Sequence, residues 1–455
     1  MAGIGFELRK LLRKDTYWGM LQAYGYAGLI SSGPWLLSIL GVSFVGVICL
    51  STQGSDGMAE YWSSVTYVIA CSLILTGPLQ LLFTRFVADR HYERKDGLII
   101  PNLMGALIIT TTVSGVLGAI AVFTLFEEPL AYRLLLLGSF VVCSNIWLVV
   151  IFLTGLKTYR SILAIFLVGY SIVVAVSYGL RGHGLEGLMA GFLLGHTVLF
   201  CALLGLVIRL HPATHFVGFE FLRRKYSFYS LAGTGLFYNL GMWGDKLVFW
   251  FAERTSVEIV GPLRGSPLYD FPVFLAYLSM IPGMAVFLFR IETDFAECYD
   301  QFYEAVREGG TLQEIERLRN GMVIALRQAI FDIFKVQGWV VAALVLFAQP
   351  MLEQLGLSPA LGQIFAVNVL GVGGLVLLLA LLNVFFYLDE RRLALGLAAG
   401  FALGNVVLSA VSIELGPSFY GFGFVAAVAL TALAGTLLLA RQLSVLEYET
   451  FMLRH

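Results

Sequence analysis

Long apolar runs separated by short polar segments make up most of this chain. A transmembrane helix needs about 20 mostly apolar residues. Twelve runs of this kind lie near residues 21–50, 61–84, 98–126, 134–156, 161–180, 187–208, 228–252, 271–289, 339–358, 361–387, 393–413 and 421–440. The pattern predicts an all-α, polytopic membrane protein with twelve transmembrane helices. Six runs precede the polar stretch at 211–227 and six follow it, and equal halves are typical of secondary transporters built from repeats.

The polar segments divide the chain into five expected parts. These are a cytoplasmic amphipathic N-terminal helix at 1–20, an N-terminal six-helix bundle at 21–210, a cytoplasmic linker at 211–227, a C-terminal six-helix bundle at 228–440 and a cytoplasmic tail at 441–455. The first part sets apolar residues such as Phe6 and Leu12 among basic ones, as a helix in the membrane interface would. The C-terminal bundle includes a long cytoplasmic loop at 291–338, which we expect to be helical.

The loop at 291–338 combines an amphipathic pattern with negative charge. Its apolar residues recur at helical spacing, a glycine pair interrupts them, and a second pattern follows, so we predict two amphipathic helices. These helices could cover the bundle or dock a cytosolic enzyme. In a docking role, Phe295 and Phe302 would be apolar anchors, and Glu304 and Glu308 would attract a basic partner surface.

Composition supports the membrane assignment. Hydrophobic residues make up 58% of the 455 residues, charged residues only 13%, and the mean hydropathy is +0.84, which is more than a soluble core requires. A net charge of -1 without a basic stripe excludes an electrostatic argument for nucleic acid. The five cysteines show no metal-binding spacing.

The distribution of Lys and Arg predicts the orientation of the helices. With the N-terminus placed in the cytoplasm, 24 of the 29 basic residues fall on the inner side of the twelve predicted spans. We therefore expect both termini to be cytoplasmic. The first apolar run is too long for a signal peptide, so we expect it to remain as a transmembrane helix.

The first and seventh apolar runs carry polar and aromatic residues at helical spacing. In lipid, such faces turn toward other helices or toward water. Aromatic rings beside hydrogen-bonding groups also suit a sugar, which has an apolar face and a rim of hydroxyls. We predict a substrate path lined by Tyr24, Ser31, Trp35, Tyr238, Asn239, Trp243, Asp245 and Lys246. Packing between helices is the alternative role for these side chains.

Asp245 and Lys246 place two opposite charges inside one of the most apolar stretches. Successive residues of a helix point about 100° apart and do not face each other, so we expect each charge to have another partner, or water. The pair then either lines a hydrated outer vestibule or bridges packed helices. Asp245 is also the only clear intramembrane candidate for the carboxylate that cation-coupled antiport usually needs, which disfavours such an antiporter.

The sequence contains no recognisable catalytic motif. It lacks a Walker sequence, G-x-S-x-G and H-E-x-x-H, and no paired carboxylates stand opposite a histidine. We expect no catalytic residues, no metal site and no cofactor. The chain should either move its cargo unchanged or support partners that do the chemistry.

Two stretches near the N-terminus carry a family resemblance. "MAGIGFELRKLL" at 1–12 and "YGYAGLISSGPW" at 24–35, with twelve spans and an enlarged inner loop, resemble the PelG family of Pel exopolysaccharide exporters over nearly the whole chain. That family resembles the multidrug/oligosaccharidyl-lipid/polysaccharide flippase superfamily. The resemblance implies two six-helix bundles around a central cavity, a bacterial inner membrane and a polymer rich in N-acetylgalactosamine. It also implies a cytosolic glycosyltransferase and membrane partners, one of which senses cyclic di-GMP.

The expected function is export of a nascent exopolysaccharide across the inner membrane, with polymerisation by the partner enzyme as the energy source. A lipid-linked oligosaccharide flippase, or a cation-coupled antiporter, would share the fold. A membrane scaffold that only anchors a polysaccharide synthase complex is an alternative from a different class. No residue of the predicted path comes from the resemblance.

Overall fold

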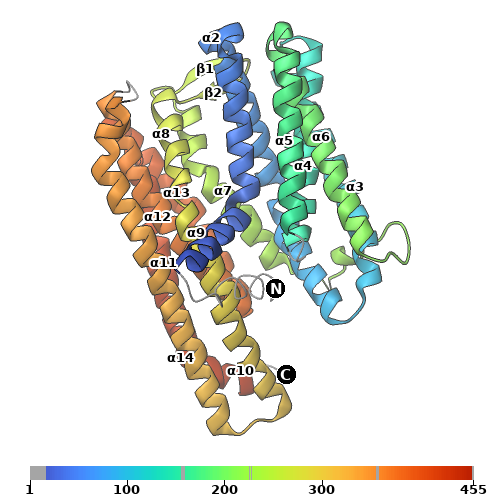
Figure 1. Cartoon of the computed structure of the whole chain (residues 1–455), viewed down its shortest axis with the longest axis vertical. Coiled ribbons are helices and arrows are strands. Elements are labelled where there is room, and N and C mark those ends of the chain that lie inside the picture. The colour runs from blue at the N-terminus through green and yellow to red at the C-terminus, as the bar shows by residue number, and fades with distance from the viewer. Residues whose placement is uncertain (1–16, 155–158, 225, 227, 355–357, 453–455) are drawn as a thin grey trace. The chain divides into compact units, whose positions relative to one another are not determined.

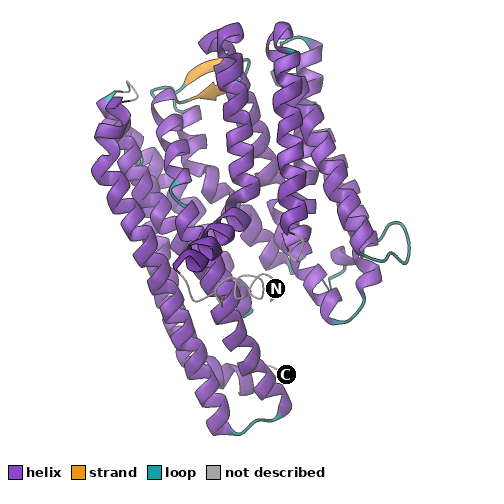
Figure 2. Cartoon of the chain, viewed as in Figure 1, coloured by secondary structure: helices purple, strands orange, loops and turns teal. Residues whose placement is uncertain are grey.

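The computed structural model describes residues 17–154, 159–224, 226, 228–354 and 358–452, and helices make up nearly all of this part (Figure 2). The helices, all labelled in Figure 1, are α2 (Tyr17–Tyr92), α3 (Ile99–Leu125), α4 (Leu130–Thr154), α5 (Tyr159–Gly179), α6 (Gly184–Leu210), α7 (Tyr229–Phe251), α8 (Pro267–Leu278), α9 (Ile281–Phe289), α10 (Ala296–Glu308), α11 (Leu312–Gln354), α12 (Pro359–Tyr387), α13 (Arg391–Leu415) and α14 (Phe422–Met452). The all-α prediction is confirmed. A short hairpin of β1 (Val257–Val260) and β2 (Leu263–Gly265) is a feature that the sequence pattern missed.

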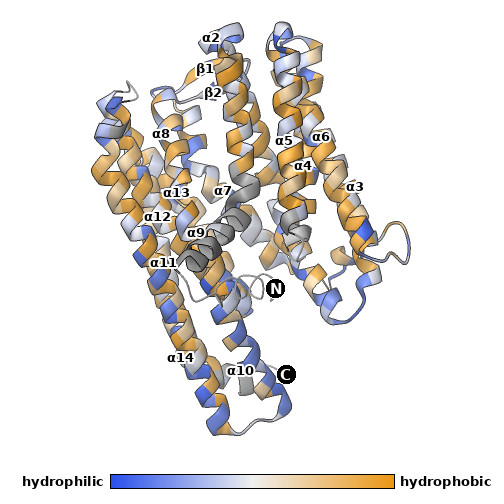
Figure 3. Ribbon diagram, in the orientation of Figure 1, coloured by the Kyte–Doolittle hydropathy of each residue, from blue (hydrophilic) through white to orange (hydrophobic). Residues whose placement is uncertain are grey.

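The twelve predicted spans all fall on these helices. Ten helical stretches of the described chain are long and apolar enough to cross a membrane. One of them, in α2, covers two predicted spans that join at Gly54, where a φ of 69° interrupts the helical backbone. α7 is not among the ten, because its Asn239, Asp245 and Lys246 lower its hydropathy. Apolar residues predominate on most of the other long helices in Figure 3, whereas the part of α11 next to α10 is polar.

The chain forms two compact units, which are described separately. Of the described residues, those within 33–243 and 250–266 form the N-terminal unit, and those within 17–32, 244–249 and 267–452 form the C-terminal unit. Two helices, α2 and α7, therefore contribute residues to both units. In particular, the charged pair of α7 belongs to the C-terminal unit, whereas most of α7 belongs to the N-terminal one.

Close backbone contact holds α7 to α2 inside the N-terminal unit. A methyl group added to Gly235 would lie 2.0 Å from the carbonyl oxygen of Gly77, so both positions need glycine to let the backbones meet. The same unit packs α6 against α4 and α5, with a buried apolar core that includes Phe192. The unit is thus a helical bundle with tight glycine contacts, as membrane helices prefer.

The C-terminal unit is built around α12, which packs against α8, α11 and α14. α9 continues through a π-helical segment, Arg290–Phe295, into α10, and a turn at Gly309 with a φ of 75° leads into α11. The two helices predicted for 291–338 are confirmed, but the second is the start of α11, a single helix of 43 residues that also contains the next span. Polar residues dominate α10 and the adjoining part of α11 (Figure 3).

Candidate functional site

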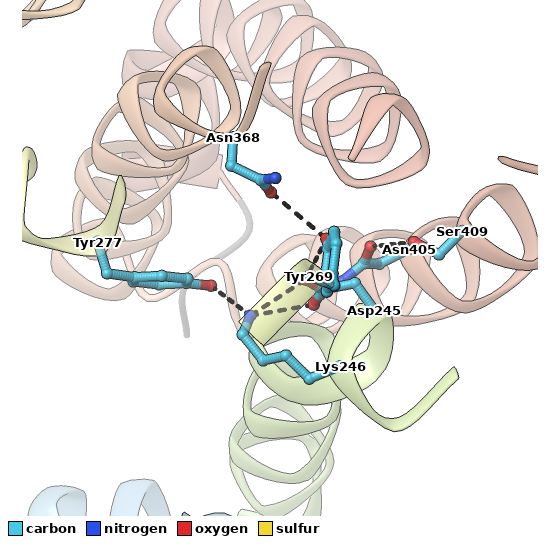
Figure 4. Close-up of polar contacts among 7 residues, drawn as sticks. All are labelled: Asp245, Lys246, Tyr269, Tyr277, Asn368, Asn405 and Ser409. Carbon is cyan, nitrogen blue, oxygen red and sulfur yellow. Dashed lines mark hydrogen bonds and ion pairs between the residues drawn. The ribbon is translucent and has the colours of Figure 1, made fainter. Parts of the chain in front are cut away.

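Asp245 and Lys246 lie at the centre of a buried polar cluster in the C-terminal unit (Figure 4). The Lys246 ammonium donates to both oxygens of the Asp245 carboxylate, over 3.1 and 3.2 Å, and to the hydroxyl of Tyr277 over 3.0 Å. Asp245 is fully buried and Lys246 is 8% exposed. The two charges thus neutralise each other away from bulk solvent.

Polar residues from three other helices complete the cluster. Tyr269 on α8 donates to Asp245 Oδ2 over 2.8 Å, and Asn405 on α13 donates to Asp245 Oδ1 over 3.1 Å. The Tyr269 hydroxyl also lies 3.4 Å from Asn368 Oδ1 on α12. Helices α7, α8 and α13 therefore meet at this carboxylate, and α12 is connected to it through Tyr269. The carboxylate thus links residues up to 160 positions apart.

Aromatic rings enclose the polar cluster. Phe249 stacks on Tyr269 with ring centroids 3.8 Å apart, and Tyr420 meets Phe249 edge-on at 5.0 Å. The Lys246 ammonium lies 4.5 Å from the centre of the Tyr277 ring, a cation–π geometry. This shell keeps the ion pair in a low-dielectric setting, where its charges interact strongly.

The expectation that neighbouring residues on a helix would not face each other was wrong for this pair. The lysine side chain is long enough to fold back along the helix and reach the preceding carboxylate. The expectation of further partners was right, because tyrosine and asparagine side chains contact both charges. The burial of both residues is what the packing interpretation expects, rather than a hydrated vestibule.

The other predicted path residues lie elsewhere. Tyr238, Asn239 and Trp243 belong to the N-terminal unit, where Asn239 is buried and donates to Gly235 O over 2.9 Å. Tyr238 and Trp243 are half-buried. The side chains of Tyr24, Ser31 and Trp35 lie outside the described part of the structure, as do residues 1–16 of the amphipathic helix predicted at 1–20. The path prediction remains untested for these residues.

Two aromatic residues near Trp243 were not among the predicted path residues. The Trp243 ring lies 6.2 Å from that of Trp250, which stacks at 4.5 Å on Tyr67 of α2. The Tyr67 hydroxyl donates to the carbonyl of Arg264 over 2.8 Å. Trp250 lies seven residues after Trp243, and helical spacing places it on the same stripe of the helix. Tyr67 is far from Trp250 in the sequence, so no spacing pattern could have connected the two residues.

The apolar anchors predicted in the 291–338 loop, Phe295 at the end of the π-helical segment and Phe302 on α10, are not available to a partner. Phe295 and Phe302 are both fully buried, and Phe295 packs edge-on against Tyr387 of α12 with centroids 5.4 Å apart. Their role is to hold α10 to its own unit, which corrects the docking prediction for these two rings. Glu304 and Glu308, by contrast, are exposed.

Among the described residues, no group of three or more His, Cys, Asp or Glu side chains is arranged to hold a metal ion. The cluster around Asp245 is instead rich in hydroxyl and amide groups. Its chemistry is that of a neutralised carboxylate with oxygen atoms around it, in a bundle that spans a membrane.

Comparison with known proteins gives a family and a fold. The chain matches the PelG family, described as an exopolysaccharide exporter (EPS-E), over residues 1–451. A comparison with curated proteins finds no match.

Solved structures with the same fold are transporters. An outward-facing multidrug resistance MATE transporter of the MOP superfamily is 16% identical, covers 93% of this chain and 96% of its own, and has a TM-score of 0.64. A variant of the Vibrio cholerae MATE transporter VcmN is 12% identical, with 97% and 98% covered and a TM-score of 0.64. A MOP superfamily transporter from Pyrococcus furiosus, titled as having a binding pocket of reverse polarity, is 16% identical, with 93% and 96% covered and a TM-score of 0.62. At these identities the likeness shows the fold alone.

Proposed function

Because this chain belongs to the PelG family of exopolysaccharide exporters, we propose that it carries a nascent exopolysaccharide across the bacterial inner membrane. The family match over residues 1–451 is the observation that carries the proposal. The multi-pass transporter fold fits it, since the polymer must cross a membrane. The proposed cargo is a Pel-like polymer rich in N-acetylgalactosamine, delivered by a cytosolic glycosyltransferase.

Aromatic residues of the N-terminal unit support a sugar as the cargo. Trp243 is half-buried, and its ring lies next to that of Trp250, which in turn stacks on Tyr67. An aromatic face can pack on the apolar face of a sugar ring, and the half-buried Tyr238 supplies a hydroxyl on the same helix. We propose that Trp243 and Tyr238 contact the polymer as it moves.

The exposed acids of α10 support a role in partner attachment. Glu297, Asp300, Glu304 and Glu308 recur at three- and four-residue intervals, so they form one stripe along the helix, and all four are exposed. Such a stripe would speed encounter with a basic surface more than it would add affinity. We propose the glycosyltransferase as one partner. Membrane proteins that include a cyclic di-GMP sensor would complete the complex.

The function can be tested in cells that make the polymer. Cells whose copy of this chain carries Trp243→Ala should secrete less polymer, while the protein remains inserted and the glycosyltransferase remains membrane-bound. Polymer recovered from the cytoplasm of these cells would favour blocked export. Normal secretion from both Trp243→Ala and Tyr238→Ala would contradict the proposed path.

The same cells separate the alternatives. A lipid-linked oligosaccharide flippase would leave a lipid-attached product that partitions into organic solvent, whereas an exporter of nascent polymer would leave none. A scaffold would lose secretion only through release of the enzyme, so substitutions on α10 would matter and Trp243→Ala would not. A cation-coupled antiporter of the same fold would stop when the ion gradients collapse.

A further inference from the structure

The Asp245 carboxylate has its acceptor capacity filled by neighbouring donors. A carboxylate has about four lone-pair sites. Here Lys246 takes one site on each oxygen, Tyr269 donates to Oδ2 and Asn405 donates to Oδ1. The positive charge of this shell comes from Lys246, which is attached to the same helix one residue later. The counter-ion of the carboxylate is thus a covalent part of the protein.

The surroundings of the Lys246 ammonium are rich in oxygen. The ammonium contacts both carboxylate oxygens and the Tyr277 hydroxyl, and the Tyr269 hydroxyl contacts the same carboxylate (Figure 4). Carboxylate, hydroxyl and amide oxygens are the ligands that hard cations prefer. The atoms that hold the ammonium are therefore the kind that would hold a small monovalent cation.

A plain packing role explains these groups less well. A buried ion pair often adds little stability compared with apolar residues of similar volume, so packing alone gives no reason for a charged pair at this position. Nor does packing require two tyrosine hydroxyls of α8 and an amide group of α13 to bond to this pair. A cation site accounts for both the buried charge and the polar groups around it, because such a site needs a carboxylate and further oxygen ligands.

We propose that the Lys246 ammonium takes the place of a coupling cation at Asp245. The C-terminal unit then contains a cation site that is permanently filled by its own side chain. Its charge does not change during transport, so this site draws no energy from a sodium or proton gradient. Removing the ammonium while keeping the carboxylate should expose a site for a monovalent cation of suitable size.

Thermal unfolding of the purified full-length protein tests the proposal without any polymer or partner. Tm is measured in detergent with NaCl, LiCl or KCl, each replacing N-methylglucamine chloride at constant ionic strength. A ligand that binds only the folded state raises Tm with its concentration. Wild-type Tm should be the same in all four salts. Lys246→Met should show a Tm that rises by at least about 3 °C with one of the small cations.

Two further variants keep the test decisive. Lys246→Arg retains the positive charge, so its Tm should be the same with every cation. Lys246→Gln repeats the neutral substitution, so the test does not depend on the folding of one variant. A wild-type Tm that rises specifically with sodium, lithium or potassium would overturn the proposal. So would neutral variants that are insensitive to every cation, or that fail to fold in all of them. None of these results depends on what the protein exports, so they are independent of the proposed function.

Discussion

Replacing Asp245 by Asn should destabilise the protein strongly. The change removes the negative charge but leaves the ammonium of Lys246, a residue only 8% exposed, among tyrosine and phenylalanine rings. Removing one partner of a buried ion pair lowers the free energy of unfolding by about 3–5 kcal/mol, because the other charge remains buried without a counter-ion. Coulomb's law gives a similar figure of roughly 5 kcal/mol for the 3.1 Å contact at an effective dielectric constant near 20.

Removing both charges should cost much less. In Asp245→Asn combined with Lys246→Met, no buried charge is left without a partner, and Tyr269 and Asn405 can still bond to the new amide. We expect the double variant to recover most of the loss, since apolar replacements of whole buried pairs are often neutral or stabilising. The pair is thus predicted to show strong coupling in a double-mutant cycle.

The assay is thermal unfolding of the purified protein in detergent, together with the yield of monodisperse protein. At roughly 2–4 °C per kcal/mol for a unit of this size, Asp245→Asn should lower Tm by at least about 6 °C. Glu258→Gln is the matched control, because Glu258 also pairs with an arginine, at 3.0 Å, but its side chain is 77% exposed. That change should cost less than about 1 kcal/mol. A Tm for Asp245→Asn within about 1 °C of wild type would refute the reasoning.

Three other predictions follow from the described contacts. Gly235→Ala should abolish the monodisperse size-exclusion peak, because its new methyl group would lie 2.0 Å from the Gly77 carbonyl oxygen, whereas Gly205→Ala meets nothing within 4 Å and should behave like wild type. Phe302→Ala should cost about 3–5 kcal/mol in unfolding free energy, since the ring is fully buried, without selectively releasing a partner. Replacing Glu304 and Glu308 by Lys should lower recovery of the glycosyltransferase in pull-downs at low salt and leave Tm unchanged, and 0.5 M salt applied to wild type should have the same effect. Unchanged enzyme recovery would remove the acidic stripe of α10 from the partner interface.

The helices could be predicted from the sequence because their signal is local. Each apolar run is long enough to cross a bilayer, and the run itself carries that information. The charges of Asp245 and Lys246 stood out for the same reason, as two polar residues within an apolar stretch. Their partners could not be predicted, because Tyr269 and Asn405 are ordinary residues of other helices, 24 and 160 positions away from Asp245.

Burial of an amphipathic face was the harder inference. Helical spacing correctly gave Phe295 and Phe302 one apolar side of a helix, but the pattern contains nothing about what covers that side. The structure covers it with residues of the same unit, including Tyr387. The division of α7 was equally hidden, since residues 244–249 belong to one unit and the rest of the helix to the other. Only the tertiary packing decides such questions.

Polymer movement through this chain is tested most directly in proteoliposomes. The purified chain is reconstituted with its membrane partners, and the glycosyltransferase and a labelled nucleotide sugar are supplied outside. Polymer that enters the lumen is protected from an added glycoside hydrolase until detergent opens the vesicles. We predict protected polymer in wild-type vesicles, much less in Trp243→Ala vesicles, and none in vesicles that lack this chain. Polymer that remains fully sensitive to the hydrolase, although the enzyme is active and bound to the vesicles, would contradict export by this protein.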